Sequence, residues 1–419
     1  MGYTKLAITG FSWLTAFRFV TRGVSLGKTA LVARFLTPSQ FGLFGIATLL
    51  LSFVEVITET GVNIFLIQQK KDTEEYYSSA WIVSVIRGSL IAVVMVLSAP
   101  YVARFFNSPE ATSLLYVMSL VPFIRGFINP AVIKLQKELL FKKEFFFRSI
   151  VLAIEIIGTV ILLIIDPTPS SLIWGLVIGV IAEVILSYFV ISPRPNLKYN
   201  RGYISELIHH GKWITGATIF NYGFERGDNI LVGRILGAQS LGIYDMAYRF
   251  SMLPITEISD VVNKVAFPVY VKISDDYLRL KKALFKTVGT ITLLVTGIGL
   301  FIILFTDPIV RIILGEQWIS VIPVLKILAV LGIIRAVSLS ISSFLLALRK
   351  QKYLTLTTFI GLTGMLITII PAISVWGIIG AAYAACFGYV LSVPFIIWFA
   401  WRSLENVKLE SNSKSTLVQ

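Results

Sequence analysis

Charged residues are scarce in this sequence of 419 residues. Asp, Glu, Lys and Arg together make up 14%, whereas 56% of the residues are hydrophobic and the mean hydropathy is +0.82. A soluble domain carries roughly 25% charged residues, because its surface must be polar. The composition therefore excludes an ordinary soluble protein and indicates a chain whose surface mostly faces lipid.

Cysteine and histidine are nearly absent as well. The single cysteine, Cys386, excludes a disulfide framework and a cysteine-rich metal site. The only histidines, His209 and His210, are adjacent, so they would point in different directions on a helix. We therefore expect no metal site, no cofactor and no catalytic residues, and we do not expect an enzyme.

Long apolar stretches predict an all-α polytopic membrane protein. A helix needs roughly 20 apolar residues to cross the hydrocarbon core. About twelve stretches of this kind are present, at 11–35, 40–66, 78–102, 112–133, 146–165, 171–191, 212–235, 240–263, 286–305, 319–347, 353–373 and 377–401. The first is too long for a signal-peptide core and has no small-residue cleavage motif after it, so we expect it to remain as a span.

Basic residues are unevenly distributed among the connections between these spans. The N-terminus, the even-numbered connections and the C-terminal tail are rich in Lys and Arg, whereas the odd-numbered connections hold only Arg104 and Arg311. Because basic segments stay in the cytoplasm, we expect both termini there, in a bacterial cytoplasmic membrane. The net charge of +14 thus reflects topology, and nucleic acid is not an expected partner.

The sequence repeats itself at an offset of 200 residues. Between 13–63 and 213–263, twelve of 51 positions are identical without a gap, among them Trp13/Trp213, Arg34/Arg234 and Asn63/Asn263. Six spans separate the two copies, so both enter from the same side as parallel repeats, a transporter architecture with the substrate path between the halves. We expect an N-terminal six-helix lobe at 1–195, a linker at 196–211, a C-terminal six-helix lobe at 212–402 and a tail at 403–419, with the lobes around a central cavity.

Both copies of the repeat contain a Gly-x-x-x-Gly motif, formed by Gly23 and Gly27 in the first copy and by Gly223 and Gly227 in the second. This spacing places both glycines on one helix face, where another backbone can approach closely. Two interpretations remain open. The motif either packs tightly within each half or forms a close, movable contact between the halves.

Charged residues inside the predicted spans are costly in lipid and usually face a partner or a water-filled cavity. By helical rise, Arg18 and Arg22 lie at the depths of Glu59 and Glu55 on the antiparallel second span, which predicts a structural ladder of two ion pairs. The same argument pairs Asp228 with Arg249, and Arg234 with Asp245. Lys28, Arg87 and Arg125 would then lack acidic partners and would bind an anion such as a diphosphate or an acidic sugar. Cations near span ends could instead extend to the interface.

The embedded charges supply the candidate site residues. Candidate substrate-binding residues are Arg18, Arg22, Lys28, Arg87, Arg125, Arg226 and Arg249. Candidates for coupling to a proton or a sodium ion are Glu55, Glu59, Asp228, Glu257 and Asp260. The first half holds six embedded cations against four acids and the second half five against five, so we expect the first half to bind the anionic part of a substrate.

Three segments resemble a known family. They are DNILVGRILG at 228–237, LGIYDMAYRFSMLP at 241–254 and ARFLTPSQFGLF at 33–44. They are similar to the polysaccharide transporter family, the Wzx-type flippases of lipid-linked oligosaccharides, in the multidrug/oligosaccharidyl-lipid/polysaccharide exporter superfamily. The resemblance covers nearly the whole chain, although many relatives have fourteen spans and this chain has about twelve.

The resemblance implies a V-shaped pair of six-helix lobes around a basic central cavity, which moves an undecaprenyl-diphosphate-linked glycan outward by alternating access. The implied partners are this glycan, membrane lipids, and a polysaccharide polymerase with its chain-length machinery. The alternatives are a membrane polymerase or ligase of lipid-linked sugars, a drug/cation antiporter of the same superfamily, and a scaffold without transport. A polymerase or ligase would need an outward-facing site, and the longest outer connections, near 103–111 and 306–318, are short and lack a catalytic set.

Overall fold

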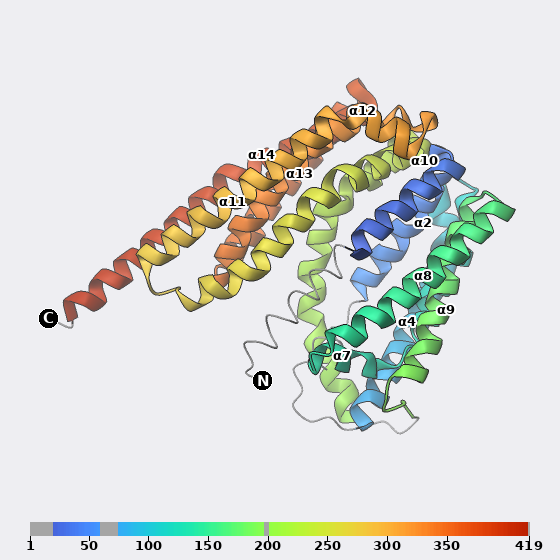
Figure 1. Ribbon diagram of the computed structural model, residues 1–419, viewed down its shortest axis with the longest axis horizontal. Helices are drawn as coiled ribbons and strands as arrows, with labels where there is room; N and C mark the ends of the chain where they lie inside the picture. Colours follow the sequence, from blue (N-terminus) through green and yellow to red (C-terminus); the bar gives the residue numbers. More distant parts are fainter. Residues whose placement is uncertain (1–19, 59–73, 197–200, 418–419) are drawn as a thin grey trace. The chain divides into compact units, whose positions relative to one another are not determined.

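The computed structural model of the protein describes residues 20–58, 74–196 and 201–417. Every regular element in these ranges is a helix, which confirms the predicted all-α fold (Figure 1). Within them, seven helices are long and apolar enough to cross a membrane, and one bent pair would add an eighth. The exact number of twelve spans stays a prediction.

The chain divides into two compact units. Unit 1 takes Met1–Tyr222 and Gly237–Gly242, and unit 2 takes Gly223–Leu236 and Ile243–Gln419. Helix α10 (Arg201–Lys272) contributes to both units and is broken at Gly237, whose φ of 82° suits a residue without a side chain. The predicted spans at 212–235 and 240–263 lie on the two sides of this break.

Unit 1 is a helical bundle. Its elements are a helix at 20–35, α2 (Pro38–Ile57), α4 (Glu74–Phe105), α5 (Ala111–Met118), α6 (Leu120–Arg125), the 3₁₀ helix η1 (Pro130–Ile133), α7 (Lys134–Lys137), α8 (Phe141–Ile165) and α9 (Pro169–Val190). Helix α2 begins at a capping box, in which the side chains of Thr37 and Gln40 each accept a hydrogen bond from the other residue's backbone N–H. Helices α8 and α9 lie side by side (Figure 1).

The predicted span at 112–133 is not one straight helix. The segment Ala111–Arg125 is followed by Pro130–Lys137 at an angle of 73°. Asn129 has an extended backbone (φ −68°, ψ 113°), because the ring of the following Pro130 disfavours a helical conformation there. A hydropathy count averages over this break and therefore misses it. We call residues 126–129 the elbow.

Two glycines at matching positions of the repeat face each other within unit 1. A Cβ on Gly42 would lie 1.7 Å from the Ala238 carbonyl oxygen, and a Cβ on Gly242 would lie 2.0 Å from the Pro38 carbonyl oxygen. Residues 38 and 238, like 42 and 242, are 200 positions apart, so the contact is reciprocal, as between two copies related by a two-fold axis. The repeat is therefore visible in the packing of these two segments.

The Gly-x-x-x-Gly motifs pack differently from the tight contact considered above. Outside their own helix, no atom of the described chain lies within 4 Å of a Cβ built on Gly23, Gly27 or Gly223, whereas a Cβ on Gly227 would lie 3.3 Å from the end of the Met365 side chain. Tight packing within the half is therefore found at Gly227 and not at the other three glycines. The close approach of backbones occurs at Gly42 and Gly242 instead.

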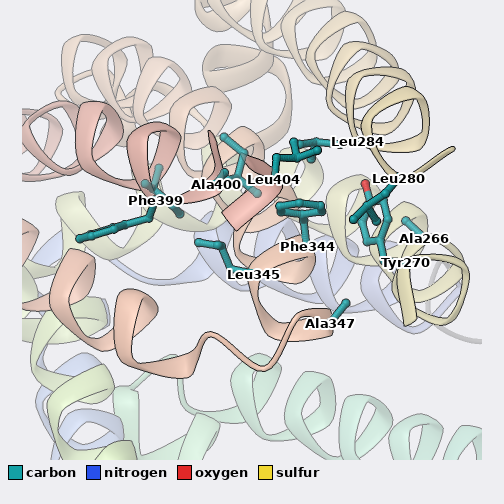
Figure 2. Close-up of a cluster of buried hydrophobic side chains, with 12 residues drawn as sticks. Ala266, Tyr270, Leu280, Leu284, Phe344, Leu345, Ala347, Phe399, Ala400 and Leu404 are labelled. Atoms are coloured by element: carbon teal, nitrogen blue, oxygen red, sulfur yellow. The ribbon is translucent and has the colours of Figure 1, made fainter. Parts of the chain in front are cut away.

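Unit 2 contains the second part of α10 together with α11 (Tyr277–Leu304), α12 (Thr306–Pro308), the π helix η2 (Ile309–Leu314), η3 (Glu316–Trp318), α13 (Val321–Ala347) and α14 (Gln351–Leu417). Helix α14 covers both predicted spans at 353–373 and 377–401 and is broken at Gly377. A buried apolar cluster joins α10, α11, α13 and α14, with the Tyr270 and Phe344 rings edge to face at its centre (Figure 2).

Candidate functional site

A polar cavity of about 510 Å³ lies within unit 1. It is lined by residues from α2, α4, α6, the elbow, η1, α7, α8 and α9. These residues are Glu55, Ser84, Arg87, Gly88, Ile91, Pro122, Arg125, Gly126, Ile128, Asn129, Pro130, Val132, Ile133, Gln136, Arg148 and Glu183. Three arginines and two glutamates thus face one cavity, which gives its wall a net positive charge.

Two Arg-Gly pairs bring α4 and α6 together at this cavity. A Cβ on Gly88 would lie 2.4 Å from the Pro122 carbonyl oxygen, and a Cβ on Gly126 would lie 2.9 Å from that of Ser84. The two backbones therefore approach as closely as only glycine permits. Arg87 and Arg125, each preceding one of these glycines, consequently line the same cavity.

The elbow is held by hydrogen bonds to its backbone. The Phe127 carbonyl oxygen accepts from Trp81 Nε1 at 3.2 Å and from Tyr188 Oη at 3.0 Å. A break in a membrane span is tolerated where side chains satisfy the freed backbone groups and the segment lines a cavity. The elbow meets both conditions, so it fixes the position of Arg125 at the end of α6.

Asn129 ties the elbow to the end of α9. This residue is fully buried, and its side-chain amide donates to the carbonyl oxygens of Ile191 at 3.2 Å and Pro193 at 3.1 Å. Its side-chain oxygen accepts from the backbone N–H of Ala131 at 3.0 Å and so caps η1. One side chain thus orders the elbow, the start of η1 and the segment after α9.

Arg125 lies between two carboxylates at long distances. Its guanidinium is 3.8 Å from Glu55 and 3.6 Å from Glu183, and its side chain is 48% exposed. A charge-assisted hydrogen bond is about 2.7–2.9 Å long, so both contacts are looser than a closed ion pair. Arg87 donates to the Glu55 backbone carbonyl at 2.9 Å.

The third arginine of the cavity belongs to a separate network. Arg148 Nε donates to the Glu144 carboxylate at 2.9 Å, and the same oxygen accepts from Gln136 at 2.7 Å. Arg148 and Gln136 lie beside the predicted cytoplasmic connection that contains Lys134, Lys137, Lys142 and Lys143. Of the cavity's five charged residues, sequence analysis named Arg87, Arg125 and Glu55 as site residues and did not name Arg148 or Glu183.

Lys28 and Arg125 were expected to lack acidic partners, and this expectation is wrong. Lys28 forms an ion pair with Glu155, and Arg125 lies near Glu55 and Glu183. The predicted pair of Arg22 with Glu55 stays a prediction. Depth along a helix predicts which residues share a level, but it does not tell which of several neighbouring helices each side chain faces. Arg18 and Glu59 lie outside the described residues, and Arg22 is exposed on the helix at 20–35.

The predicted pair of Asp228 with Arg249 in unit 2 is wrong, and the pair of Arg234 with Asp245 stays a prediction. Arg249 donates to Asp245 at 2.8 Å, and Arg226 lies 3.9 Å from the same carboxylate. Asp228 is buried and accepts a hydrogen bond from Tyr244 Oη at 2.8 Å. The two other candidate coupling residues lie further along α10, where Glu257 is buried and Asp260 is exposed.

Sequence analysis did not identify the ion pair of Arg335 in unit 2 as part of a site. Arg335 on α13 pairs with Glu225 on α10 at 2.6 Å and donates to Tyr248 Oη, also at 2.6 Å. The sequence contained a usable signal for this pair, because Arg335 is a basic residue in the middle of the apolar stretch at 319–347. Among the described residues, no group of three His, Cys, Asp or Glu side chains could hold a metal ion.

Comparison with known proteins identifies the family. The family described as polysaccharide biosynthesis protein matches residues 31–323. The chain is 25% identical to the lipopolysaccharide biosynthesis protein WzxC of Escherichia coli (strain K12) over 397 residues, covering 93% of this chain and 79% of that protein.

Solved structures share the fold. The lipid II flippase MurJ, in an inward closed conformation, aligns with a TM-score of 0.75 at 18% identity and covers 96% of this chain and 90% of its own. An inward-facing multidrug resistance MATE family transporter of the MOP superfamily aligns with a TM-score of 0.68 at 15% identity, covering 96% and 95%. Because a flippase and a drug transporter share this fold, the fold alone does not select the substrate. The family match and the apolar helices together identify the chain as a multi-pass membrane protein that belongs to the polysaccharide biosynthesis protein family.

Proposed function

We propose that this protein is a flippase that moves an undecaprenyl-diphosphate-linked oligosaccharide across the bacterial cytoplasmic membrane for the synthesis of a cell-surface polysaccharide. The observation that carries the proposal is the cavity of unit 1, where Arg87, Arg125 and Arg148 face one space. A diphosphate is the anionic group that such a cavity suits, because guanidinium groups bind phosphate oxygens in pairs. The similarity to a lipopolysaccharide biosynthesis protein and a lipid II flippase supports the same substrate class.

In this mechanism the diphosphate enters from the cytoplasmic side, beside Arg148 and Gln136, and then reaches Arg87 and Arg125. The two arginines come from α4 and α6, and the close backbone approach at Gly88 and Gly126 keeps them together. The sugar and the lipid tail extend away from the arginines. Alternating access then releases the substrate to the outer leaflet, with both termini of the chain in the cytoplasm.

Glu55 and Glu183 have a part in release. A phosphate oxygen can form shorter bonds to Arg125 than the 3.8 Å and 3.6 Å contacts that these carboxylates make. The substrate therefore displaces the carboxylates when it binds, and they take the guanidinium back when it leaves. This exchange avoids an unpaired cation in the empty transporter, which would be costly inside a membrane.

The remaining candidate residues keep their proposed roles. Arg18, Arg22, Lys28, Arg226 and Arg249 would contribute positive charge along the substrate path. Glu59, Asp228, Glu257 and Asp260, together with Glu55, are candidates for coupling to a proton or a sodium ion. A polysaccharide polymerase and its chain-length machinery would receive the exported units.

Deletion of the gene followed by lipid analysis tests this function. We expect complete undecaprenyl-linked units to accumulate on the cytoplasmic leaflet, because they are assembled but not moved. Complementation with the wild-type gene should restore surface polysaccharide. Exported single units that remain unpolymerised would show a polymerase instead, and unchanged polysaccharide with altered drug resistance would show an antiporter.

A further inference from the structure

A basic and aromatic patch lies on unit 2. It is formed where α11 begins and where α14 continues beyond its last predicted span. Its members are Tyr277, Lys281, Trp398, Trp401, Arg402 and Lys408, which we call the α11–α14 patch.

Cations and rings alternate across this patch. Lys281 Nζ lies 5.9 Å from the centre of the Tyr277 ring and 5.8 Å from that of Trp401. Lys408 Nζ lies 5.8 Å from the same Tyr277 ring. Two ammonium groups thus share one ring, although like charges repel each other. Arg402 lies over Trp398 in the same way, at 5.6 Å.

Buried packing holds the two helices in this arrangement. Leu280 and Leu284 of α11 and Phe399, Ala400 and Leu404 of α14 belong to the apolar cluster of unit 2 (Figure 2). The Tyr353 ring stacks on Phe399 with the centroids 4.3 Å apart. The polar faces of both helices are therefore fixed, and the patch is a property of the fold.

Two acidic residues close to the patch in sequence have other partners. Asp276, which precedes Tyr277, pairs with Arg279 at 3.1 Å. Glu405 accepts a hydrogen bond from Trp401 Nε1 at 3.0 Å. Neither Lys281 nor Arg402 forms an ion pair with the described part of the chain. Lys281 and Arg402 are thus available to a negatively charged ligand in the part of the chain that the structure describes.

The position of the α11–α14 patch along the chain indicates which kind of anion it binds. Trp398 and Trp401 are 53% and 49% exposed and lie where the apolar stretch of α14 ends. Exposed tryptophans at such a place sit at the level of lipid headgroups. The basic residues follow directly, on the predicted cytoplasmic side, where the leaflet contains acidic phospholipids.

We propose that the α11–α14 patch binds the phosphate of an acidic phospholipid of the cytoplasmic leaflet. Lys281, Arg402 and Lys408 contact the headgroup, while Trp398 and Trp401 lie against the glycerol and upper acyl region. This site is independent of the proposed transport substrate, because it uses no residue of the arginine cavity.

Native mass spectrometry of the full-length protein from nanodiscs tests the site. The discs contain either phosphatidylcholine alone or phosphatidylcholine with phosphatidylglycerol. We expect phosphatidylglycerol to stay bound to the wild type and to raise its melting temperature. The triple variant Lys281→Gln, Arg402→Gln, Lys408→Gln should bind this lipid at least about tenfold more weakly, since basic residues near a membrane surface each add attraction.

A matched control removes the same charge elsewhere. Lys272, Lys282 and Lys286 are exposed basic residues at the same end of α10 and α11, and their triple change to Gln should leave lipid retention near the wild-type level. Equal loss in both triple variants would overturn the proposal, because it would show a general charge effect. Full retention by the patch variant, or equal stabilisation by inorganic phosphate in phosphatidylcholine discs, would also overturn it. Size-exclusion chromatography shows whether each variant is folded.

Discussion

Arg125 is the residue around which the proposed chemistry is organised. It is half exposed to the cavity, lies at the end of α6 and has a carboxylate on each side at 3.6 Å and 3.8 Å. These distances allow attraction without a closed hydrogen bond. A guanidinium held in this way can bind a stronger ligand such as a phosphate. When the ligand is absent, the two carboxylates still balance its positive charge.

Replacing one of these carboxylates should change the balance between binding and release. In Glu183→Gln, we expect the diphosphate-linked glycan to bind about tenfold more tightly, or about 1.4 kcal/mol, because a competing negative charge is removed. Transport should slow, because the transporter without substrate loses the carboxylate that balances the charge of Arg125. Binding and flipping are measured with the purified variant in proteoliposomes.

The control for Glu183→Gln is Glu110→Gln. Glu110 is exposed in the same unit and does not line the cavity. The control should leave the affinity for the lipid-linked glycan near the wild-type value. Glu183→Gln could instead weaken glycan binding, or change neither the affinity for the glycan nor the rate of flipping. Either result would contradict the proposal that the diphosphate displaces the carboxylates from Arg125.

At the scale of elements, the broken span and the reciprocal glycine contact determine how unit 1 is built. The elbow is ordered by Asn129, Trp81 and Tyr188, and it lines the cavity directly after Arg125. The contact of Gly42 with the segment around Gly242 joins α2 to the part of α10 that follows Gly237. Both features depend on backbone groups, so single substitutions should have large effects.

Asn129→Ala should destabilise the elbow. The change leaves the buried carbonyl of Ile191 and the half-buried carbonyl of Pro193 without their donor and removes the cap of η1, which costs about 1–3 kcal/mol. We expect a lower melting temperature in detergent and weaker binding of the lipid-linked glycan. Asn406→Ala, on an exposed part of α14, should have neither effect. A wild-type melting temperature for Asn129→Ala would show that the elbow does not depend on this side chain.

Gly42→Ala and Gly242→Ala should each destabilise the protein. A Cβ at either position would overlap a backbone carbonyl, so the two segments must separate at a cost of about 1–3 kcal/mol. Because the contact is reciprocal, the two substitutions should lower the melting temperature by similar amounts. Gly23→Ala meets no described atom within 4 Å and serves as the control. Normal stability of Gly42→Ala would mean that the two segments do not meet in the membrane.

At the scale of the whole molecule, sequence analysis predicted the all-α membrane fold, the family, and the two arginines that share the cavity. These follow from hydropathy, from recognisable segments and from the cost of burying a cation in lipid. The partners of the charges and the elbow were not predicted. Ion-pair partners depend on which helices are neighbours, and the elbow depends on how one proline changes the residue before it. The pairs Arg87-Gly88 and Arg125-Gly126 were a usable signal, because each combines a costly charge with a site of close backbone approach.

Translocation by purified protein in proteoliposomes tests the central claim most directly. The substrate is an undecaprenyl-diphosphate-linked oligosaccharide, and its movement between leaflets is followed with an enzyme that modifies only the outer leaflet. We predict that the wild type flips this lipid and that Arg311→Ala, which removes an exposed arginine paired with Glu316, does so at a similar rate. The double variant Arg87→Ala, Arg125→Ala should be folded and at least about tenfold slower. Flipping by the double variant at the wild-type rate would contradict the assignment of the arginine cavity as the diphosphate site.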